Sequence, residues 1–582
     1  MLQKMLSSVK TGRNAAKGKG DAENGGGKVG RCAAAGVFSC VKMAFLPCDM
    51  PRGMVQSKAY EKGVIVLKPQ IINIINFIRA VEPREPALDL LLPVQKQIEL
   101  MAELGLSGTF LLQYDALCDE RYTMLLKQAE NIEIGLWFEI PRPLAEAAGL
   151  VWRGRPGFDW DWYANVGFSV GYTPAEREKI IDVMMGKFHA VFGRYPQSVG
   201  SWLIDAHSLL YMKGKYGITA SCNCKDQWGT DGYTLWGGYY GQAYYPSRLN
   251  AYTPAQTKAN QIDVPVFKML GSDPIYQYDL GLDLAGAPDE CQKVVTLEPI
   301  YKGDAGGGGE PDWVDWYFRE NYNGVCIHFA YAQAGQENSF GWPRMCGGIM
   351  DQFHKIAALA AEGEVQVMTL AESGAWFAAQ FDTTPPTAIA AFSDWKGRAV
   401  QSLWFNAARY RVNWYAEQDM FWIRDWHVFD ERYAERYLNA VCDKTYLVYD
   451  NLPVMDGNRW SGGNVRAGIY PVNQEGMPLR FANVSADDSV GALRIGFDGA
   501  GGAFSVVCHA DSLAFQYVAP FELRFAAHAA LPLQSCTPDR AVFAHNGYAY
   551  ALCAEYGRFV NDGRFQIVSD VCGRLVIRIE TV

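Results

Sequence analysis

Acidic side chains end several short apolar runs of this chain, and they are the residues most able to do chemistry. Glu139 lies at the end of GLWFEI, Asp205 ends PQSVGSWLID, and Glu337 lies in HFAYAQAGQENSFGW (residues 328–342). Hydrolysis of a glycosidic bond needs two carboxylates on opposite sides of the bond, one as an acid and one as a nucleophile or base. We therefore take Asp205, Glu337 and Glu139 as candidate catalytic residues.

Residue types that suit sugar binding accompany these carboxylates. Aromatic rings stack on sugar faces, and amide and charged groups hold hydroxyls. The candidates are Arg84, Asp115, Trp137, Trp202, Asp226, Trp228, Asp231, Gln336 and Trp342. Each has a structural alternative: a rim salt bridge for Arg84, and an aromatic loop packed on the fold around Trp228. Glu337 is alternatively a solvated surface residue, and Asp205 the N-cap of a helix that starts near residue 207 or 208.

The most specific pattern surrounds Asp205. PQSVGSWLID continues as AHSLLYMKGKYGI, so a strand tip leads into a helix and a glycine turn. This segment resembles the fourth-strand segment of the glycoside hydrolase/deacetylase superfamily, and most closely that of glycoside hydrolase family 57, approximately W-L-P-E-[CA]. Trp202, Leu203 and Ala206 match, whereas Ile204 replaces the proline and Asp205 replaces the glutamate. The resemblance covers roughly residues 69–378 and implies that Asp205 is the nucleophile.

The same resemblance implies that the general acid/base lies on a late strand, which suits Glu337, and it raises metal-dependent deacetylation as a competing activity. Deacetylases of the superfamily use an Asp-Asp pair on the first strand and a His-x3-His pair near the third. The first strand here offers Asn73 and Asn76, and the eight histidines show no HxH, HExxH or HxxxH spacing. The first-strand His-x-His of family 57 is also missing. We therefore predict no metal and no cofactor, with an atypical site of Asp115, His207 and Asp226 as the alternative.

The elements that must position these residues alternate between strand and helix from about residue 69. The expected strands are 71–80, 108–112, 132–140, 199–204, 218–222, 264–270, 325–330 and 365–370, and the expected helices are 93–104, 120–129, 174–192, 208–215 and 349–361. This alternation predicts βαβ units and a parallel sheet, in which function lies at the carboxyl ends of the strands. The acids expected at those ends are Asp115, Glu139, Asp205, Glu337 and Glu372.

Beyond FDTTPPT (residues 381–387) the pattern changes to short strands divided by Gly, Asn and Asp turns. Expected strands are 400–405, 446–449, 504–508, 541–543, 548–553 and 575–579. The predicted fold class is α/β, a (β/α)7-like distorted TIM-type barrel followed by an all-β sandwich. The predicted organisation is a basic, Gly-rich, disordered segment and lead-in at 1–68, a catalytic barrel at 69–378, a linker at 379–387 and the sandwich at 388–582.

Composition and net charge argue against some classes of binding partner. The 582 residues are 49% hydrophobic and carry a net charge of −10, which predicts a folded protein that is a poor nucleic-acid binder. No run of about 18 apolar residues occurs, so no membrane-spanning helix is expected. The 14 cysteines lack a dense regular spacing and predict reduced thiols in the cytoplasm.

These observations predict a retaining glycoside hydrolase with a carbohydrate substrate. The alternatives are a metal-dependent deacetylase-like enzyme and a non-catalytic carbohydrate-binding protein of the same fold. The sugar, its linkage, endo or exo action and the oligomeric state are not determined by the sequence.

Overall fold

The computed structural model describes residues 68–224, 238–276, 295–304, 306–448, 451–457, 459–488 and 491–580. These ranges belong to one compact unit, Val66–Val582. The candidate residues Asp226, Trp228 and Asp231 lie outside the described residues.

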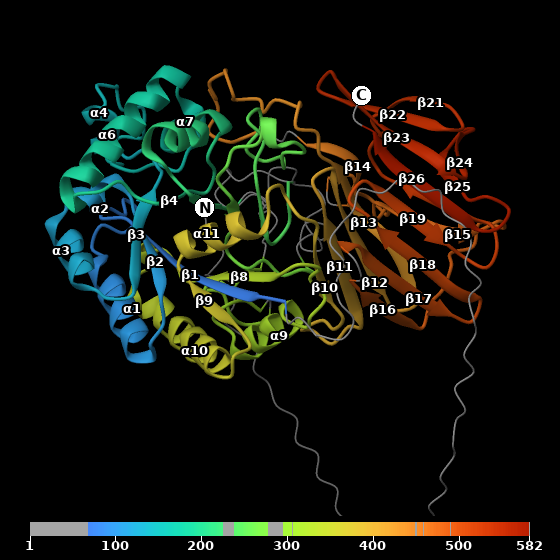
Figure 1. Cartoon of the computed structure of the whole chain (residues 1–582), viewed down its shortest axis with the longest axis horizontal. Helices are drawn as coiled ribbons and strands as arrows, with labels where there is room; N and C mark the ends of the chain where they lie inside the picture. Colours follow the sequence, from blue (N-terminus) through green and yellow to red (C-terminus); the bar gives the residue numbers. More distant parts are fainter. Residues whose placement is uncertain are drawn as a thin grey trace, which may run out of the picture. The chain divides into compact units, whose positions relative to one another are not determined.

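A parallel sheet forms the first part of the fold, a mixed α/β curled half-barrel (Figure 1). Its strand order is β6-β7-β5-β4-β3-β2-β1-β8, with β9 also paired to β1, and β6 is the antiparallel member. The strands are β1 (Gln70–Ile78), β2 (Gly108–Leu112), β3 (Ile132–Trp137), β4 (Ser198–Gly200), β5 (Ala220–Asn223), β6 (Ala243–Tyr244), β7 (Val266–Lys268), β8 (Ala330–Ala334) and β9 (Gln366–Met368). Because β1 to β5, β7 and β8 run in parallel, their carboxyl ends share one edge of the sheet.

Helices connect these strands. They are α1 (Leu91–Leu104), α2 (Tyr114–Cys118), α3 (Glu120–Gln128), α4 (Arg142–Ala147), α5 (Ala164–Gly167), α6 (Pro174–Phe192), α7 (Ala206–Tyr216), α9 (Pro311–Asn321), α10 (Trp342–Ala361) and α11 (Leu370–Gln380). The start of α6 follows from its sequence, because Thr173 and Glu176 form a reciprocal capping box and Pro174 occupies the first turn. It ends at Gly193, which has φ of 73°.

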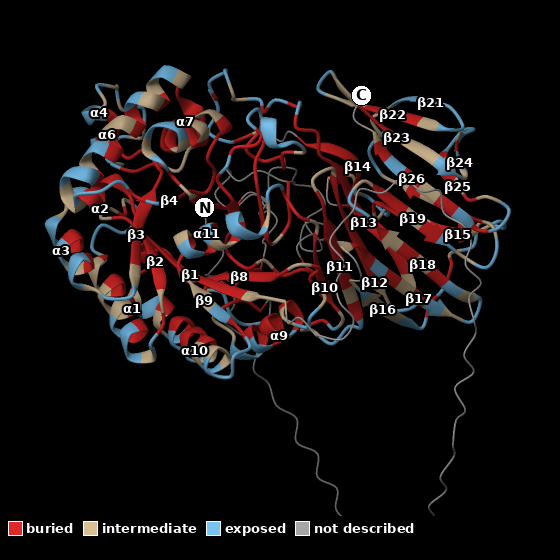
Figure 2. Cartoon of the chain, viewed as in Figure 1, coloured by how far each residue is buried: buried red, intermediate tan, exposed pale blue. Residues whose placement is uncertain are grey.

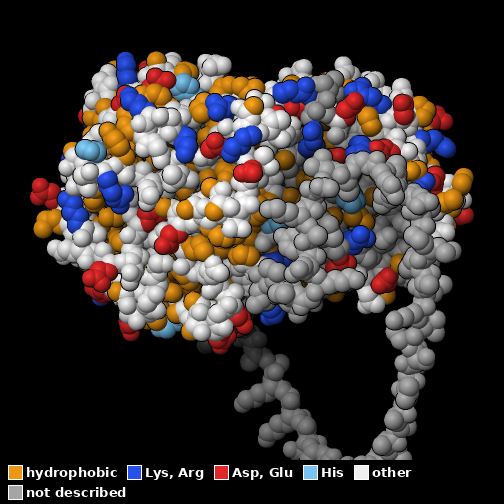
Figure 3. All heavy atoms as spheres, viewed as in Figure 1, with side chains coloured by type: hydrophobic (Ala, Val, Ile, Leu, Met, Phe, Trp, Pro, Cys, Tyr) orange, Lys and Arg blue, Asp and Glu red, His pale blue; other side chains and the backbone are white. Residues whose placement is uncertain are grey.

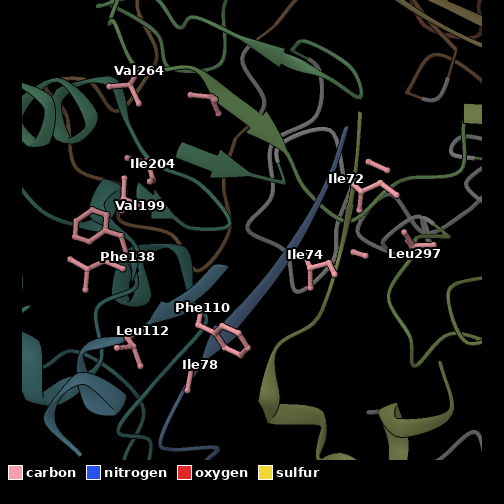
Figure 4. Packing of buried hydrophobic residues seen from close by; sticks show 14 of the residues in the cluster. Ile72, Ile74, Ile78, Phe110, Leu112, Phe138, Val199, Ile204, Val264 and Leu297 are labelled. Carbon is pink, nitrogen blue, oxygen red and sulfur yellow. The ribbon is translucent and has the colours of Figure 1, made fainter. Parts of the chain in front are cut away.

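Strands β1 to β8 are buried on both faces, as parallel strands between two apolar layers are, whereas β9 is partly exposed (Figure 2). Even-numbered residues of β1, including Ile72, Ile74 and Ile78, pack against the helices in the outer layer (Figure 4). Odd-numbered residues, including Ile71, Ile75 and Phe77, belong to a separate cluster inside the curl. We call this inner side the lumen.

Because side chains alternate between the two faces of a strand, the inner row continues past the strand ends at every second residue. In the lumen Phe77 stacks on Trp137 with ring centroids 4.2 Å apart, and Trp202 meets Trp137 edge-on at 6.1 Å. Two residues beyond Phe77 and Trp137 lie Arg79 and Glu139. The aromatic layer is therefore followed by a polar layer at the carboxyl edge of the sheet.

Two antiparallel sheets follow the half-barrel. One has the order β10-β11-β12-β13-β15-β20-β25-β24 with β14 paired to β13, and the other β16-β17-β18-β19-β26-β23-β22-β21. Their strands are β10 (Thr387–Ala391), β11 (Val400–Asn406), β12 (Tyr410–Glu417), β13 (Met420–Val428), β14 (Leu452–Asp456), β15 (Gly468–Asn473), β16 (Asn483–Asp487), β17 (Leu493–Gly499), β18 (Gly502–Cys508), β19 (Ser512–Gln516), β20 (Phe521–Ala526), β21 (Leu533–Cys536), β22 (Arg540–His545), β23 (Tyr548–Tyr556), β24 (Arg558–Asn561), β25 (Phe565–Val568) and β26 (Arg574–Glu580). One apolar cluster holds residues of both sheets, which makes this part a β-sandwich.

The first antiparallel sheet packs against the half-barrel. Tyr240 stacks on Trp404 of β11 with ring centroids 4.0 Å apart, and Arg411 of β12 donates to the Gly238 carbonyl at 2.8 Å. On the face drawn in Figure 3, the described lysines and arginines are interspersed with aspartates and glutamates. Among the described helices, none is long and apolar enough to cross a membrane.

The predicted fold class is confirmed, and most predicted elements are present with shifted ends. The strand expected at 325–330 is wrong, because β8 begins at Ala330 and Ile327 has φ of 70°, which interrupts an extended chain. The expected strand at 199–204 ends at Gly200, and residues 446–448 form no strand. The proposed domain boundaries stay predictions; α11 ends at Gln380 and β10 begins at Thr387.

Glu372 follows the carboxyl end of β9, but this end lies beside Asn73 in the first half of β1, away from the edge that the carboxyl ends of the other parallel strands share. Glu372 forms a capping box with Thr369 at the start of α11. It lines a groove together with Ser107 and Ile132, which lie at the amino ends of β2 and β3. It therefore lies at the opposite edge from the polar layer.

We expect Gly200→Ala to destabilise the protein by about 1–3 kcal/mol, the usual cost of overpacking a core. A Cβ at Gly200 would lie 2.5 Å from Leu111 Cδ1 and 2.6 Å from Cys222 Sγ in the lumen. Gly186→Ala in α6 is the matched control: its Cβ would meet nothing within 4 Å, and we expect a gain of up to about 1 kcal/mol in helix stability. Denaturant unfolding measures both, and a neutral Gly200→Ala would contradict the packed lumen.

Candidate active site

Arg79 is the centre of the polar layer and bridges two carboxylates. It follows β1 and is only 1% exposed. Its Nε and Nη2 donate to the carboxylate of Glu139, beyond β3, at 3.0–3.1 Å. Its Nη1 donates to Glu337, in the loop after β8. One guanidinium thus joins the carboxyl ends of three strands.

Three further side chains surround the Arg79 guanidinium. Gln113, at the end of β2, accepts from Arg79 Nε at 3.1 Å. Ser339 donates to Glu337 Oε1 at 2.6 Å and accepts from Arg79 Nη1 at 3.3 Å. The Trp160 ring lies over the guanidinium, 3.9 Å from its carbon. Arg79 is therefore held in one orientation from several sides.

Two carboxyl groups of this layer, those of Glu139 and Asp115, have pKa values above those of carboxylates in water. Burial raises the pKa of Glu139 to about 7; Arg79 lowers it and Glu337 adds to the rise. Asp115, at the start of α2, accepts from the backbone N–H groups of Ala80 at 3.0 Å and its neighbour Ala116 at 2.8 Å. Burial raises the pKa of Asp115 to about 6 against these hydrogen bonds. Both acids therefore titrate near neutral pH.

Gln336, Trp137 and Trp202 lie next to this group. The Gln336 side-chain oxygen accepts from the Glu337 backbone N–H at 2.8 Å, and its amide donates to Glu298 at 3.0 Å. Trp137 and Trp202 form the aromatic layer beneath. The structure thus places Gln336, Trp137 and Trp202 with Glu139 and Glu337 at one end of the lumen.

Arg84 lies at the rim of the site. It donates to both Glu82 carboxylate oxygens, at 2.7 and 2.6 Å. This is the rim salt bridge expected as the structural alternative to sugar binding. Its guanidinium also lies over the rings of Trp160 and Trp162, at 5.8 and 5.1 Å.

Asp205 is the N-cap of α7, which confirms the structural alternative for this residue. Its Oδ1 accepts from the Ser208 backbone N–H at 2.9 Å and from Arg177 Nη1 at 3.0 Å, and its Oδ2 accepts from the Ser208 hydroxyl at 2.6 Å. Trp202 points into the lumen, whereas Asp205, three residues later, faces Arg177 of α6. Its assignment as the nucleophile stays a prediction.

The remaining candidates lie away from the polar layer or outside the described residues. Trp342 begins α10 and packs against the outer apolar cluster. His207, proposed for an atypical metal site, lies 3.1 Å from Glu178 of α6. Within the described ranges, no three His, Cys, Asp or Glu side chains are placed to hold a metal ion.

Sequence reasoning missed Arg79, Ser339 and Trp160. Arg79 had a signal, since it continues the inner row of β1 two residues beyond Phe77. Trp160 had none, because the loop between α4 and α5 has no periodicity that fixes its path.

Comparisons with known proteins concern the fold. No protein-family model matches the sequence, and no curated protein matches it significantly. A candidate glycoside hydrolase/deacetylase from Parabacteroides distasonis is 14% identical, with TM-score 0.48 over 65% of this chain and 89% of that one. A glycoside hydrolase family 57 branching enzyme from Thermococcus kodakaraensis is 11% identical, with TM-score 0.28 over 54% of this chain and 72% of that one. A 4-alpha-glucanotransferase from Thermococcus litoralis is 8% identical, with TM-score 0.29 over 88% of this chain and 98% of that one. These similarities are too low to transfer a residue role to this chain.

The segment between β13 and β14 ties the β-sandwich to Asp205. Arg177 donates to the carbonyls of Tyr437, Leu438 and Ala440 at 2.8–3.3 Å. Glu435 accepts from the backbone N–H groups of Ala206 and Ala251, both at 2.9 Å. Burial, with the nearby Asp205 charge, raises the pKa of Glu435 to about 8.

We expect Glu435 to make stability depend on pH. Because its pKa is raised on folding from 4.5, its contribution is complete below pH 4.5 and is lost as pH rises to about 8, at about 1.4 kcal/mol per unit. The free energy of unfolding of Glu435→Gln should lack this decline. Glu431→Gln in the same segment is the control: burial raises the pKa of Glu431, but hydrogen bonds from Asn260, Gln256 and Thr257 bring it below its usual value. Identical slopes in wild type and Glu435→Gln would contradict this account.

Proposed function

We propose that this chain is a carbohydrate-active enzyme that hydrolyses glycosidic bonds with Glu139 and Glu337 as its carboxylate pair. The observation that carries the proposal is the single Arg79 guanidinium shared by both carboxylates. One positive charge does not balance two ionised carboxylates in a buried site, so the group is neutral when one of them holds a proton. A carboxylic acid beside a carboxylate is the pair that glycoside hydrolysis requires.

Burial assigns the proton to Glu139, whose pKa is raised to about 7. In the proposed reaction, this proton passes to the glycosidic oxygen as the bond to the anomeric carbon breaks, and a Glu337 oxygen bonds to that carbon. The ionised Glu139 then takes a proton from a water molecule. The oxygen of that water bonds to the anomeric carbon and displaces the Glu337 carboxylate. This double displacement retains the anomeric configuration, which requires carboxyl groups about 5–5.5 Å apart; a shared guanidinium favours such a short separation.

This assignment differs from the one that the resemblance implied for Asp205. Both oxygens of Asp205 are engaged in capping α7 and pairing with Arg177. We therefore assign Asp205 to positioning α7 and the β4 tip. Deacetylation and binding without turnover remain the competing functions, and the assays below separate them.

Glu139→Gln and Glu337→Gln should each lower the turnover of folded protein by about 10²–10⁴-fold, the usual effect of removing a proton-transferring or nucleophilic carboxyl group. The measurement is sugar release from p-nitrophenyl glycosides and oligosaccharides, with acetate release followed in parallel. Acetate release in place of sugar release would support deacetylation, and saccharide binding without turnover would support a binding protein.

Glu133→Gln is the matched control, since Glu133 is a buried glutamate at the amino end of β3. It accepts from Thr109 at 2.9 Å and from the Ala371 backbone N–H at 2.9 Å, and burial raises its pKa. We expect lower stability with unchanged turnover per folded molecule. Asp205→Asn decides the nucleophile: loss of turnover there, with activity retained in Glu337→Gln, would contradict the proposed pair.

The pH dependence of kcat/KM should report the titration of Glu139. Because an acid must be protonated to donate, kcat/KM should fall as pH rises through about 7, the value to which burial raises the pKa of Glu139. In Glu139→Gln the residual activity should not show this limb. A wild-type profile flat from pH 5 to 9 would rule out Glu139 as the acid.

A further inference from the structure

We propose that Asn338 is a positioning residue of the active site: its side-chain amide fixes the loop that carries Glu337 to the backbone of Arg79. The consequence for catalysis rests on the proposed function, whereas the effect on the carboxylate pair can be measured without a substrate. The inference is drawn from the end of the β1–β8 pairing, from the hydrogen bonds of one buried amide and from the closed set of contacts that these bonds create.

The ladder between β1 and β8 ends before the chain reaches Glu337. Strand β8 pairs with residues Gln70–Ile74 of β1, and its last paired residue is Ala334. Strand β1 continues beside β2, whereas the chain after β8 turns at Gly335, which has φ of 95°. A Cβ at Gly335 would lie 2.4 Å from the Ile75 carbonyl oxygen, so the loop passes close to β1. Because the ladder stops here, other groups must bond the backbone of this part of β1.

Two asparagine side chains supply these bonds. The Asn76 side-chain oxygen accepts from the Gln336 backbone N–H at 3.2 Å. The Asn338 side-chain oxygen accepts from the Arg79 backbone N–H at 2.9 Å, and its nitrogen donates to the Arg79 carbonyl at 2.7 Å. The same nitrogen donates to the carbonyl of Leu90, the N-cap of α1, also at 2.7 Å. Asn338 thus bonds both backbone groups of Arg79, as a neighbouring strand would.

The Asn338 amide has one orientation. It is 1% exposed, and its oxygen and both N–H groups are bonded. Turning the amide over would place its NH2 group against the Arg79 N–H and its oxygen against two carbonyls. Removing the amide would leave these buried backbone groups without partners, which is more costly than losing an exposed hydrogen bond. The loop is therefore held to β1 in a single register.

These bonds close a ring of contacts between Arg79 and Glu337. The Arg79 backbone bonds the side chain of Asn338, and the Arg79 guanidinium bonds the carboxylate of the preceding residue, Glu337. Both ends of the arginine are thus joined to the same loop. Glu139 shares the guanidinium from the other side. The position of Glu337 relative to Glu139 therefore depends on the backbone anchor as well as on the ion pairs.

The link from Asn338 to Glu139 makes a prediction that a purely structural role does not. Arg79 lowers the pKa of Glu139, and the Glu337 carboxylate raises it. If the loop loses its anchor, Glu337 moves away from the guanidinium and from Glu139. The guanidinium is then less shared, and the repulsion from Glu337 is weaker. Both changes favour the ionised form of Glu139 and lower its pKa.

The first test follows this carboxyl group directly. In Asn338→Ala, we expect the pKa of Glu139 to fall by about half a pH unit, an approximately threefold loss of proton affinity. It is measured by ¹³C NMR titration of protein labelled at the glutamate δ-carbons, and the signal is assigned by its loss in Glu139→Gln. If Asn338→Ala does not fold, Asn338→Thr takes its place, because its hydroxyl can keep one of the three bonds. We expect a smaller fall there.

Asn73→Ala is the matched control. Asn73 is also a fully buried asparagine of β1, and its amide donates to the Met368 carbonyl at 2.8 Å and the Ser373 hydroxyl at 2.7 Å. These bonds hold β9 and α11, at the other end of β1. We expect lower stability with an unchanged pKa of Glu139. An unchanged pKa in the folded Asn338 variant, or an equal fall in Asn73→Ala, would overturn the inference.

The second test concerns catalysis. We expect Asn338→Ala to lower kcat on p-nitrophenyl glycosides about 10–100-fold with little change in KM, because a displacement of about 1 Å in a reacting group can cost about 10²-fold. The decline of kcat/KM at high pH should begin at lower pH than in the wild type. A wild-type kcat in the folded variant would contradict the positioning role. If the wild-type protein cleaves no glycoside, the proposed function is refuted, and the titration still decides whether Asn338 positions the carboxylate pair.

Discussion

The buried positive charge of Arg79 is the constraint on which the site depends. An ion of this kind is costly to bury unless carboxylates and hydrogen-bond acceptors surround it, and removing one partner of a buried pair typically costs about 3–5 kcal/mol. Its partners come from the ends of β2 and β3 and from the loop after β8. The guanidinium therefore fixes where these chain segments meet, and the curl of the sheet must bring them within its reach.

The same physical solution recurs where the β-sandwich meets the half-barrel. Arg177 is fully buried, pairs with Asp205 and donates to carbonyls of the segment between β13 and β14. Arg411 of β12 pairs with Asp425 and reaches the Gly238 carbonyl. Arg177, a charge of the half-barrel, is satisfied in part by the segment after β13, and Arg411, a charge of the first antiparallel sheet, in part by a half-barrel carbonyl. The sandwich is thus a structural partner of the half-barrel as well as a separate apolar core.

The proposed chemistry uses the balance that this burial creates. Two carboxylates on one guanidinium cannot both be ionised without leaving a net charge in a poorly solvated place. One fold therefore supplies an acid and a base from the same residue type, as environments that separate two carboxyl pKa values generally do. The Trp160 ring over the Arg79 guanidinium helps to orient the cation.

The sequence by itself determined most of the elements and the edge of the sheet at which the candidate carboxylates Glu139 and Glu337 lie. Alternation of apolar strands and amphipathic helices predicted the parallel half-barrel, turn-rich short strands predicted the sandwich, and the carboxyl ends of the strands held Glu139, Glu337 and Asp115. Only the tertiary structure decided which acids meet. Glu139 and Glu337 are 198 positions apart in the chain and are joined by an arginine that the motif search passed over, while Asp205, in the most family-like motif, turns outward to cap α7. The reason is physical: periodicity fixes the face on which a side chain lies, but the partner of a buried charge is set by the curl of the sheet and by loops such as that of Trp160, which carry no period.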